Sequence, residues 1–111
     1  MEYTLKVYET LDGTKPLMEW LRNLRDIKAR TMIRTRLDRM EQGNFGYCEP
    51  VGDGVSEMKI DLGPGYRIYF GMIGRTIVLL LCGGDKKSQQ KDIRNALECF
   101  RDHKQRAKKN G

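Results

Sequence analysis

Lysine, arginine and tyrosine alternate with apolar residues in the stretch EMKIDLGPGYRIYF, which begins at residue 57, and these side chains could bind a phosphodiester. Lys59, Arg67 and Tyr69 occupy positions of one parity, and apolar residues occupy the other. Successive strand residues face opposite sides of a sheet, so we expect the three polar residues to share a face. There Arg67 can clamp an anion, and Tyr69 can stack on a base or donate its hydroxyl.

The same alternation predicts the register of this hairpin. A three-residue loop at 63–65 would pair Leu62 with Tyr66, which sets Asp61 opposite Arg67 and Lys59 opposite Tyr69. A two-residue loop would set apolar residues opposite polar ones, which a sheet with one buried face rejects. In a purely structural interpretation, Asp61 and Arg67 form an exposed ion pair worth less than about 1 kcal/mol.

A second basic segment follows an apolar strand predicted over 76–82. Two glycines and Asp85 lead into Lys86, Lys87 and Ser88, where Ser88 is a suitable N-cap for the last helix. A helix N-terminus offers free N–H groups and a positive dipole end, and two lysines beside it suit a phosphate. The spacing is not that of a P-loop.

An N-terminal strand and two helices are predicted ahead of the hairpin. The strand covers 3–8, and Thr14 can cap a helix that takes Pro16 in its first turn. Asp26 can cap a second helix that ends near residue 42. Because the helices are joined so tightly, we expect an antiparallel αα-hairpin.

The segments between and after these elements carry weaker signals. Residues 44–54 are rich in glycine and indicate a loop or a short strand over about 47–51. The basic tail, 103–111, is expected to fray. Its His103 is the only histidine in the chain, and we interpret it as a surface residue.

Composition limits the chain to one domain of 111 residues. Net charge is +6, which favours a polyanionic partner, although a generally basic surface explains it equally well. Three cysteines without metal spacing indicate reduced thiols in a cytosolic protein. No secretory signal or membrane-length apolar run is visible, so we expect a soluble, cytoplasmic protein that binds no membrane. Asp85 and Asp92 fit no divalent-ion pattern, and we predict no metal and no cofactor.

The paired motifs GPGYRIYF and GGDKKSQ, together with PLMEWL in the first helix, give the chain a family resemblance. It resembles the RelE/HigB-type toxins of type II toxin–antitoxin modules, in particular the phage-related addiction module killer protein branch. The similarity covers nearly the whole chain. It implies a single α+β domain over 1–111 with the order β-α-α-β-β-β-α. The sheet would be mostly antiparallel, with an N-terminal αα-hairpin and a C-terminal helix.

The resemblance also implies an activity and its residues. Such toxins are endoribonucleases that cleave mRNA, usually on the translating ribosome, and a cognate antitoxin silences them; here a helix-turn-helix antitoxin is expected. The family pattern carries over onto catalytic Arg67, Tyr69 and Lys86, with Lys59, Lys87 and Lys91 as RNA and phosphate contacts. Family members often have arginine where this chain has Lys59, so a bidentate grip becomes a single-point contact.

Metal-free RNA cleavage uses the 2′-hydroxyl as nucleophile and needs proton transfer and cations for the developing phosphate charge. We expect Arg67 on the scissile phosphate and Lys86 in proton transfer or charge stabilisation. Crowded cations would lower a lysine pKa from its usual value of about 10.4. Two alternatives remain: a non-catalytic nucleic-acid-binding protein, and a phage-derived inhibitor whose basic face binds an acidic partner.

Overall fold

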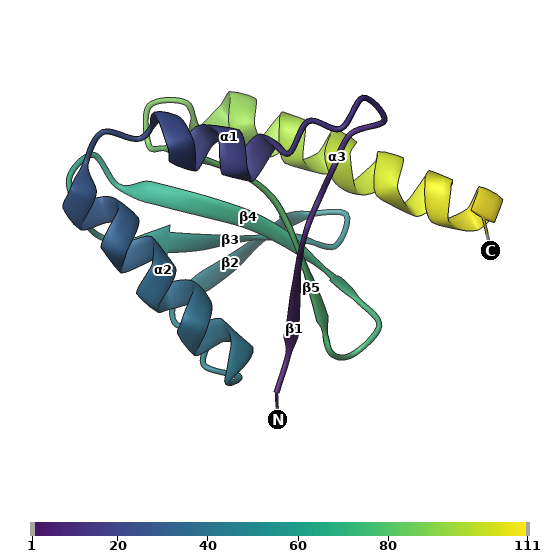
Figure 1. Cartoon of the computed structure of the whole chain (residues 1–111), viewed down its shortest axis with the longest axis horizontal. Coiled ribbons are helices and arrows are strands. Elements are labelled where there is room, and N and C mark those ends of the chain that lie inside the picture. The colour runs from purple at the N-terminus through teal and green to yellow at the C-terminus, as the bar shows by residue number, and fades with distance from the viewer. Residues whose placement is uncertain (1, 111) are drawn as a thin grey trace.

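The computed structural model describes residues 2–110, which form one five-stranded sheet and three helices (Figure 1). The elements in chain order are β1 (Thr4–Val7), α1 (Pro16–Asn23), α2 (Ile27–Glu41), β2 (Cys48–Gly52), β3 (Val55–Ile60), β4 (Tyr66–Ile73), β5 (Ile77–Asp85) and α3 (Gln89–Asn110). The strand order in the sheet is β1-β5-β4-β3-β2. Strand β1 runs parallel to β5, and the other neighbouring pairs are antiparallel.

The predicted fold class is wrong in its element order and in its helical hairpin, and the sheet is a mixed one with a single parallel pair among three antiparallel pairs. Strand β2, at the sheet edge, is absent from the predicted element order, although a short strand over about 47–51 was one of the two alternatives for this segment. Strand β1 makes the sheet mixed. Helix α1 makes its main contacts with β5, and α2 runs at an angle to α1 rather than antiparallel beside it (Figure 1). The cause lies in the connection, where Leu24 and Asp26 both have extended backbone and redirect the chain.

The sheet is covered on both faces, which is why its central strands are buried almost throughout. Apolar side chains from α1 and α2 pack on one face, around Ile68, Phe70 and Leu80. Helix α3 packs on the other face through Ala96 and Phe100. The amphipathic stripe of α3 therefore uses the same sheet face that we had predicted to be polar and open.

The helix ends show which local signals hold. Asp26 caps α2 as predicted, because its Oδ1 accepts the N–H of Ala29 at 3.0 Å. Thr14 does not cap α1, which begins at Pro16 after Lys15. The described part of the predicted frayed tail is helical, since α3 continues to Asn110.

Contacts near its C-terminal end tie α3 to the start of the chain. The hydroxyl of Tyr8 donates to Asp102, and Arg106 forms an ion pair of 2.8 Å with the same carboxylate. Arg106 also donates to the carbonyl of Glu9. These contacts fix α3 against the end of β1. Among the described residues, no helix has the length and apolar character needed to cross a bilayer.

Candidate functional site

The β3–β4 hairpin differs from the predicted register by two residues. Ile60 pairs with Tyr66, so Lys59 lies opposite Arg67 and Glu57 lies opposite Tyr69. The connecting loop covers 61–65, and Asp61 is exposed within it rather than opposite Arg67. A shift of two keeps every side chain on its predicted face, because side-chain direction repeats every two residues.

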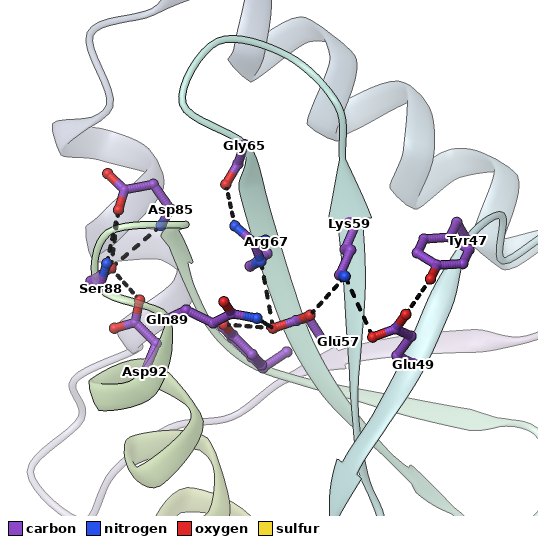
Figure 2. Close-up of polar contacts among 11 residues, drawn as sticks. Tyr47, Glu49, Glu57, Lys59, Gly65, Arg67, Asp85, Ser88, Gln89 and Asp92 are labelled. Atoms are coloured by element: carbon purple, nitrogen blue, oxygen red, sulfur yellow. Dashed lines mark hydrogen bonds and ion pairs between the residues drawn. The ribbon is translucent and has the colours of Figure 1, made fainter.

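Glu57 is the centre of a buried polar network at this hairpin (Figure 2). Its side chain is 1% exposed, and its Oε2 lies 3.6 Å from Nε of Arg67. The same oxygen accepts the hydroxyl of Tyr69 at 3.0 Å and the amide of Gln89, from α3, at 2.9 Å. A buried carboxylate is costly without such partners, so these contacts keep Glu57 stable inside the protein.

Arg67 is itself buried and is held from two sides. Its Nη1 donates to the carbonyl of Gly65 at 2.8 Å, and its Nε faces Glu57 without a hydrogen-bond partner. The guanidinium is therefore oriented before any ligand arrives. A preoriented cation costs little reorganisation when it meets a developing negative charge.

Carboxylates and cations alternate across the three strands in a row that we call the charge ladder: Glu49, Lys59, Glu57 and Arg67 (Figure 2). Nζ of Lys59 lies 3.4 Å from Glu49 and 4.0 Å from Glu57. The predicted crowding of cations is therefore not what the structure shows, because each cation of the ladder has a carboxylate beside it. The formal charges of the ladder cancel.

A cavity of about 450 Å³ opens beside the ladder, and we call it the basic cavity. Its lining consists of Arg36, Tyr47, Lys59, Ile60, Asp61, Gly65, Tyr66 and Arg67. Arg36, on α2, is anchored there because its Nη1 donates to the carbonyl of Lys59 at 2.8 Å. Three cations and one carboxylate belong to this lining, and Glu49 and Glu57, outside the lining, pair with two of the cations. The cavity therefore offers an anionic ligand such as a phosphate three nearby cationic donors rather than a large excess of charge.

The three lysines predicted after β5 lie at different places relative to the basic cavity. Lys86 is exposed. It lies beside the hairpin loop, since a Cβ added to Gly65 would be 3.8 Å from the Cβ of Lys86. Lys87 and Lys91 are exposed, and neither belongs to the cavity lining. The structure thus brings Lys59 and Arg67 together, with Lys86 adjacent.

Tyr69 occupies a different position from the one that base stacking requires. Its side chain is wholly buried beneath α3, and its hydroxyl donates to Glu57. Burial, followed by the nearby Glu57 carboxylate, raises the pKa of Tyr69 above its usual value. Tyr69 therefore acts on the basic cavity only indirectly, by positioning Glu57 and through it Arg67.

The predicted phosphate site at the start of α3 is occupied by the protein's own carboxylates. Oδ1 of Asp85 accepts the N–H of Ser88 at 3.1 Å, and the hydroxyl of Ser88 donates to Asp92. A Cβ on Gly84 would lie 1.8 Å from Oδ2 of Asp92, and one on Gly83 would lie 2.4 Å from the ring of Trp20. The two glycines therefore allow close packing rather than cradle an anion. Burial raises the pKa of Asp92.

Sequence reasoning gave no role to three residues that the structure places at this site. Arg36, on α2, and Gln89, at the start of α3, are not among the site residues that the sequence predicts. Tyr47, just before β2, is 59% exposed and lines the basic cavity. Its position in a glycine-rich segment was the available signal, because an aromatic residue there lacks an apolar pattern to bury it.

No known protein-family model matches the chain. A protein from Haemophilus influenzae (strain ATCC 51907 / DSM 11121 / KW20 / Rd), named "Uncharacterized protein", is 46% identical to it over 77 residues. The matched region is 69% of this chain and 78% of the relative. The chain therefore belongs to the same family as that protein. The name of the relative states no activity, so function has to be argued from the site.

Proposed function

We propose that this protein is the toxin of a type II toxin–antitoxin module, a metal-independent endoribonuclease that cleaves mRNA in the cytoplasm. The observation that carries the proposal is the basic cavity, where Arg36, Lys59 and Arg67 meet beside the exposed Lys86. The net charge of +6 and the motif resemblance to RelE/HigB-type toxins support the same conclusion. A cognate antitoxin, expected to be a helix-turn-helix protein, would silence the activity.

The chemistry requires the side chains of this chain and water. The RNA 2′-hydroxyl loses its proton to water and attacks the adjacent phosphorus. The bond to the 5′-oxygen breaks and that oxygen gains a proton, so that a 2′,3′-cyclic phosphate and a 5′-hydroxyl result. Arg67, oriented by Gly65 and Glu57, stabilises the charge that develops on the phosphate oxygens. Lys86 forms no ion pair within residues 2–110, so its ammonium is available for charge stabilisation or for protonating the leaving oxygen.

Lys59 and the remaining lysines have supporting roles in this proposal. Lys59 gives a single-point contact to a phosphate, and it must partly leave Glu49 to do so. Lys87 and Lys91 lie outside the cavity lining, where they attract the RNA backbone without touching the scissile phosphate. We infer that the mRNA is bound on the ribosome, since translating ribosomes present single-stranded mRNA to the toxins that this chain resembles.

Inducible expression in a bacterial host tests this function. Wild type is expected to arrest growth, and the double variant Lys59→Ala/Lys86→Ala is expected to lose the arrest while it stays folded, because both lysines are at least partly exposed. Lys108→Ala/Lys109→Ala removes the same charge at the far end of α3 and serves as the matched control. Growth arrest that persists in the double variant would overturn the assignment of these residues.

A non-catalytic RNA-binding protein is the second candidate. Its supporting observation is that the Glu57 carboxylate, the nearest candidate base to Arg67, is 1% exposed and already accepts hydrogen bonds from Tyr69 and Gln89 at Oε2, so a substrate proton has little access to it. Incubation with RNA alone and with translating ribosomes, followed by mapping of new 5′ ends, separates the two candidates. Binding without new ends would favour the non-catalytic protein.

A further inference from the structure

Tyr47 presents an exposed aromatic ring at the rim of the basic cavity. The residue is 59% exposed, whereas the other aromatic member of the lining, Tyr66, is buried. Exposing an aromatic ring to water is unfavourable, but single exposed rings are common on protein surfaces. Exposure alone therefore does not indicate a function. What distinguishes Tyr47 is its place next to an anion-binding cavity.

Three contacts fix the orientation of this ring. The hydroxyl of Tyr47 donates to Glu49, and the carbonyl of Tyr47 accepts the N–H of Lys59 at 3.2 Å. Nζ of Lys59 lies 5.4 Å from the ring centroid, within the range of a cation–π contact. Figure 2 shows Tyr47, Glu49 and Lys59 in one row at the β2 side of the charge ladder. The ring is thus held in place while much of its surface stays open.

We propose that Tyr47 stacks on a base of single-stranded RNA whose backbone phosphate lies in the basic cavity. A cationic groove beside an exposed aromatic ring is the arrangement by which single-stranded nucleic acids are bound with little sequence preference. Lys59 joins the two parts, because it contacts the Tyr47 ring and lines the cavity together with Arg67. The inference rests on the proposed function, and it assigns to Tyr47 the stacking role that buried Tyr69 is not placed to take.

The cavity size and the sheet position agree with this ligand. About 450 Å³ falls within the range of small-molecule sites, so it admits one phosphate with part of its sugar but not a duplex. Tyr47 leads into β2, the edge strand of the sheet, so a base on its ring lies at the rim and the strand continues outside. An RNA single strand can therefore pass along the edge with one nucleotide inserted.

Binding of a short single-stranded RNA oligonucleotide with 2′-O-methyl riboses tests the stacking, because the blocked 2′-hydroxyl prevents cleavage. Fluorescence anisotropy at several salt concentrations gives the dissociation constant and its salt dependence. Tyr47→Ala is expected to weaken binding by about 5- to 150-fold, the range for loss of one base stack. Tyr47→Phe keeps the ring and is expected to bind within about two-fold of wild type. Leu11→Ala, at a highly exposed turn residue, is the control for surface truncation.

The salt dependence distinguishes stacking from an electrostatic role. A stacking residue neutralises no phosphate, so Tyr47→Ala should leave the slope of log K against log salt unchanged, whereas Lys86→Ala should reduce it by about 0.7. A 2-aminopurine base in the oligonucleotide should be quenched by wild type and by Tyr47→Phe but not by Tyr47→Ala.

Equal affinity of wild type and Tyr47→Ala, equal losses in Tyr47→Phe and Tyr47→Ala, or no binding by wild type would each overturn the stacking proposal. Failure of the proposed function looks different. In that case the oligonucleotide binds in a Tyr47-dependent way, but unmodified RNA stays intact and growth continues. Cleavage by wild type together with equal oligonucleotide affinity in Tyr47→Ala would instead reject the stacking and keep the endoribonuclease.

Discussion

Glu57 and Arg67 lie on neighbouring strands with their charged groups 3.6 Å apart, and both side chains are almost fully buried. The pair holds the guanidinium at the wall of the basic cavity, with Gly65 on its other side. Arg67 is therefore both a candidate catalytic residue and a structural one. A variant that simply deletes Arg67 mixes these two roles, and the predictions below separate them.

Removal of the Glu57 carboxylate should destabilise the fold strongly. Glu57→Ala leaves Arg67 buried without its counter-charge, and breaking a buried ion pair in this way costs about 3–5 kcal/mol of unfolding free energy. Urea denaturation measures the loss. Glu49→Ala is the matched control, since Glu49 also pairs with Lys59 but its side chain is 45% exposed, and it should cost less than about 1 kcal/mol. Equal costs for the two variants would contradict the buried network.

Tyr69→Phe should lower both stability and activity, although the buried side chain of Tyr69 does not contact RNA. The variant removes the hydrogen bond of 3.0 Å to Glu57, and a bond to a charged group contributes about 1.5–3 kcal/mol. Urea denaturation and growth arrest are the measurements. If Tyr69 instead stacks on a base, Tyr69→Phe keeps the ring and should behave like wild type in both.

Gly83→Ala should be destabilising for a purely steric reason. The new methyl group would lie 2.4 Å from the Trp20 ring, and overpacking of this kind costs about 1–3 kcal/mol. The double variant Gly83→Ala/Trp20→Leu measures the coupling, because a smaller side chain at 20 makes room for the methyl group. Unfolding free energies that are strictly additive would show that α1 does not pack on β5 as described.

Alkaline pH should destabilise the protein through buried tyrosines. Burial, followed by the hydrogen bond to Asp102, raises the pKa of Tyr8 from 10.0 to about 12. Between these values the folded state keeps a proton that the unfolded chain has lost, so the unfolding free energy falls as pH rises. Tyr8→Phe should make this fall shallower in urea titrations from about pH 9 to 12. The decline that remains belongs to the other groups whose pKa values are raised by burial, which are Tyr66, Tyr69, Cys48, Cys82 and Cys99. An unchanged slope in Tyr8→Phe would contradict the Tyr8–Asp102 contact.

The sequence predicted the faces of the hairpin but not its register. Alternation correctly assigned Lys59, Arg67 and Tyr69 to one face. A register shift of two residues leaves that alternation unchanged. Only the loop geometry therefore decides whether Asp61 or Glu57 is the carboxylate near Arg67. The segment of β2 was predicted as either a loop or a short strand, because Pro50 and the surrounding glycines are poor strand formers. Tyr47 was missed for the same reason.

Burial of the polar face is a tertiary effect that local patterns did not reveal. Ala96 and Phe100 form the buried stripe of α3, and this stripe packs on the sheet face that carries Tyr69. Applying that constraint would have predicted a covered Tyr69 and a buried Glu57. The antiparallel arrangement of the two N-terminal helices was likewise predicted from their short connection. Their packing on the sheet, such as that of α1 on β5, determines their orientation instead.

The most direct test of the central claim is the chemistry of RNA cut by the purified protein in EDTA, on translating ribosomes and on free RNA. We predict products with 5′-hydroxyl and 2′,3′-cyclic phosphate ends. A 2′-deoxy substitution at the cleavage position should abolish the cut, and Lys86→Ala should slow it by about 100-fold or more while Lys108→Ala does not. Intact RNA under both conditions, or cleavage that needs added Mg²⁺ and leaves 5′-phosphate ends, would contradict the proposed function.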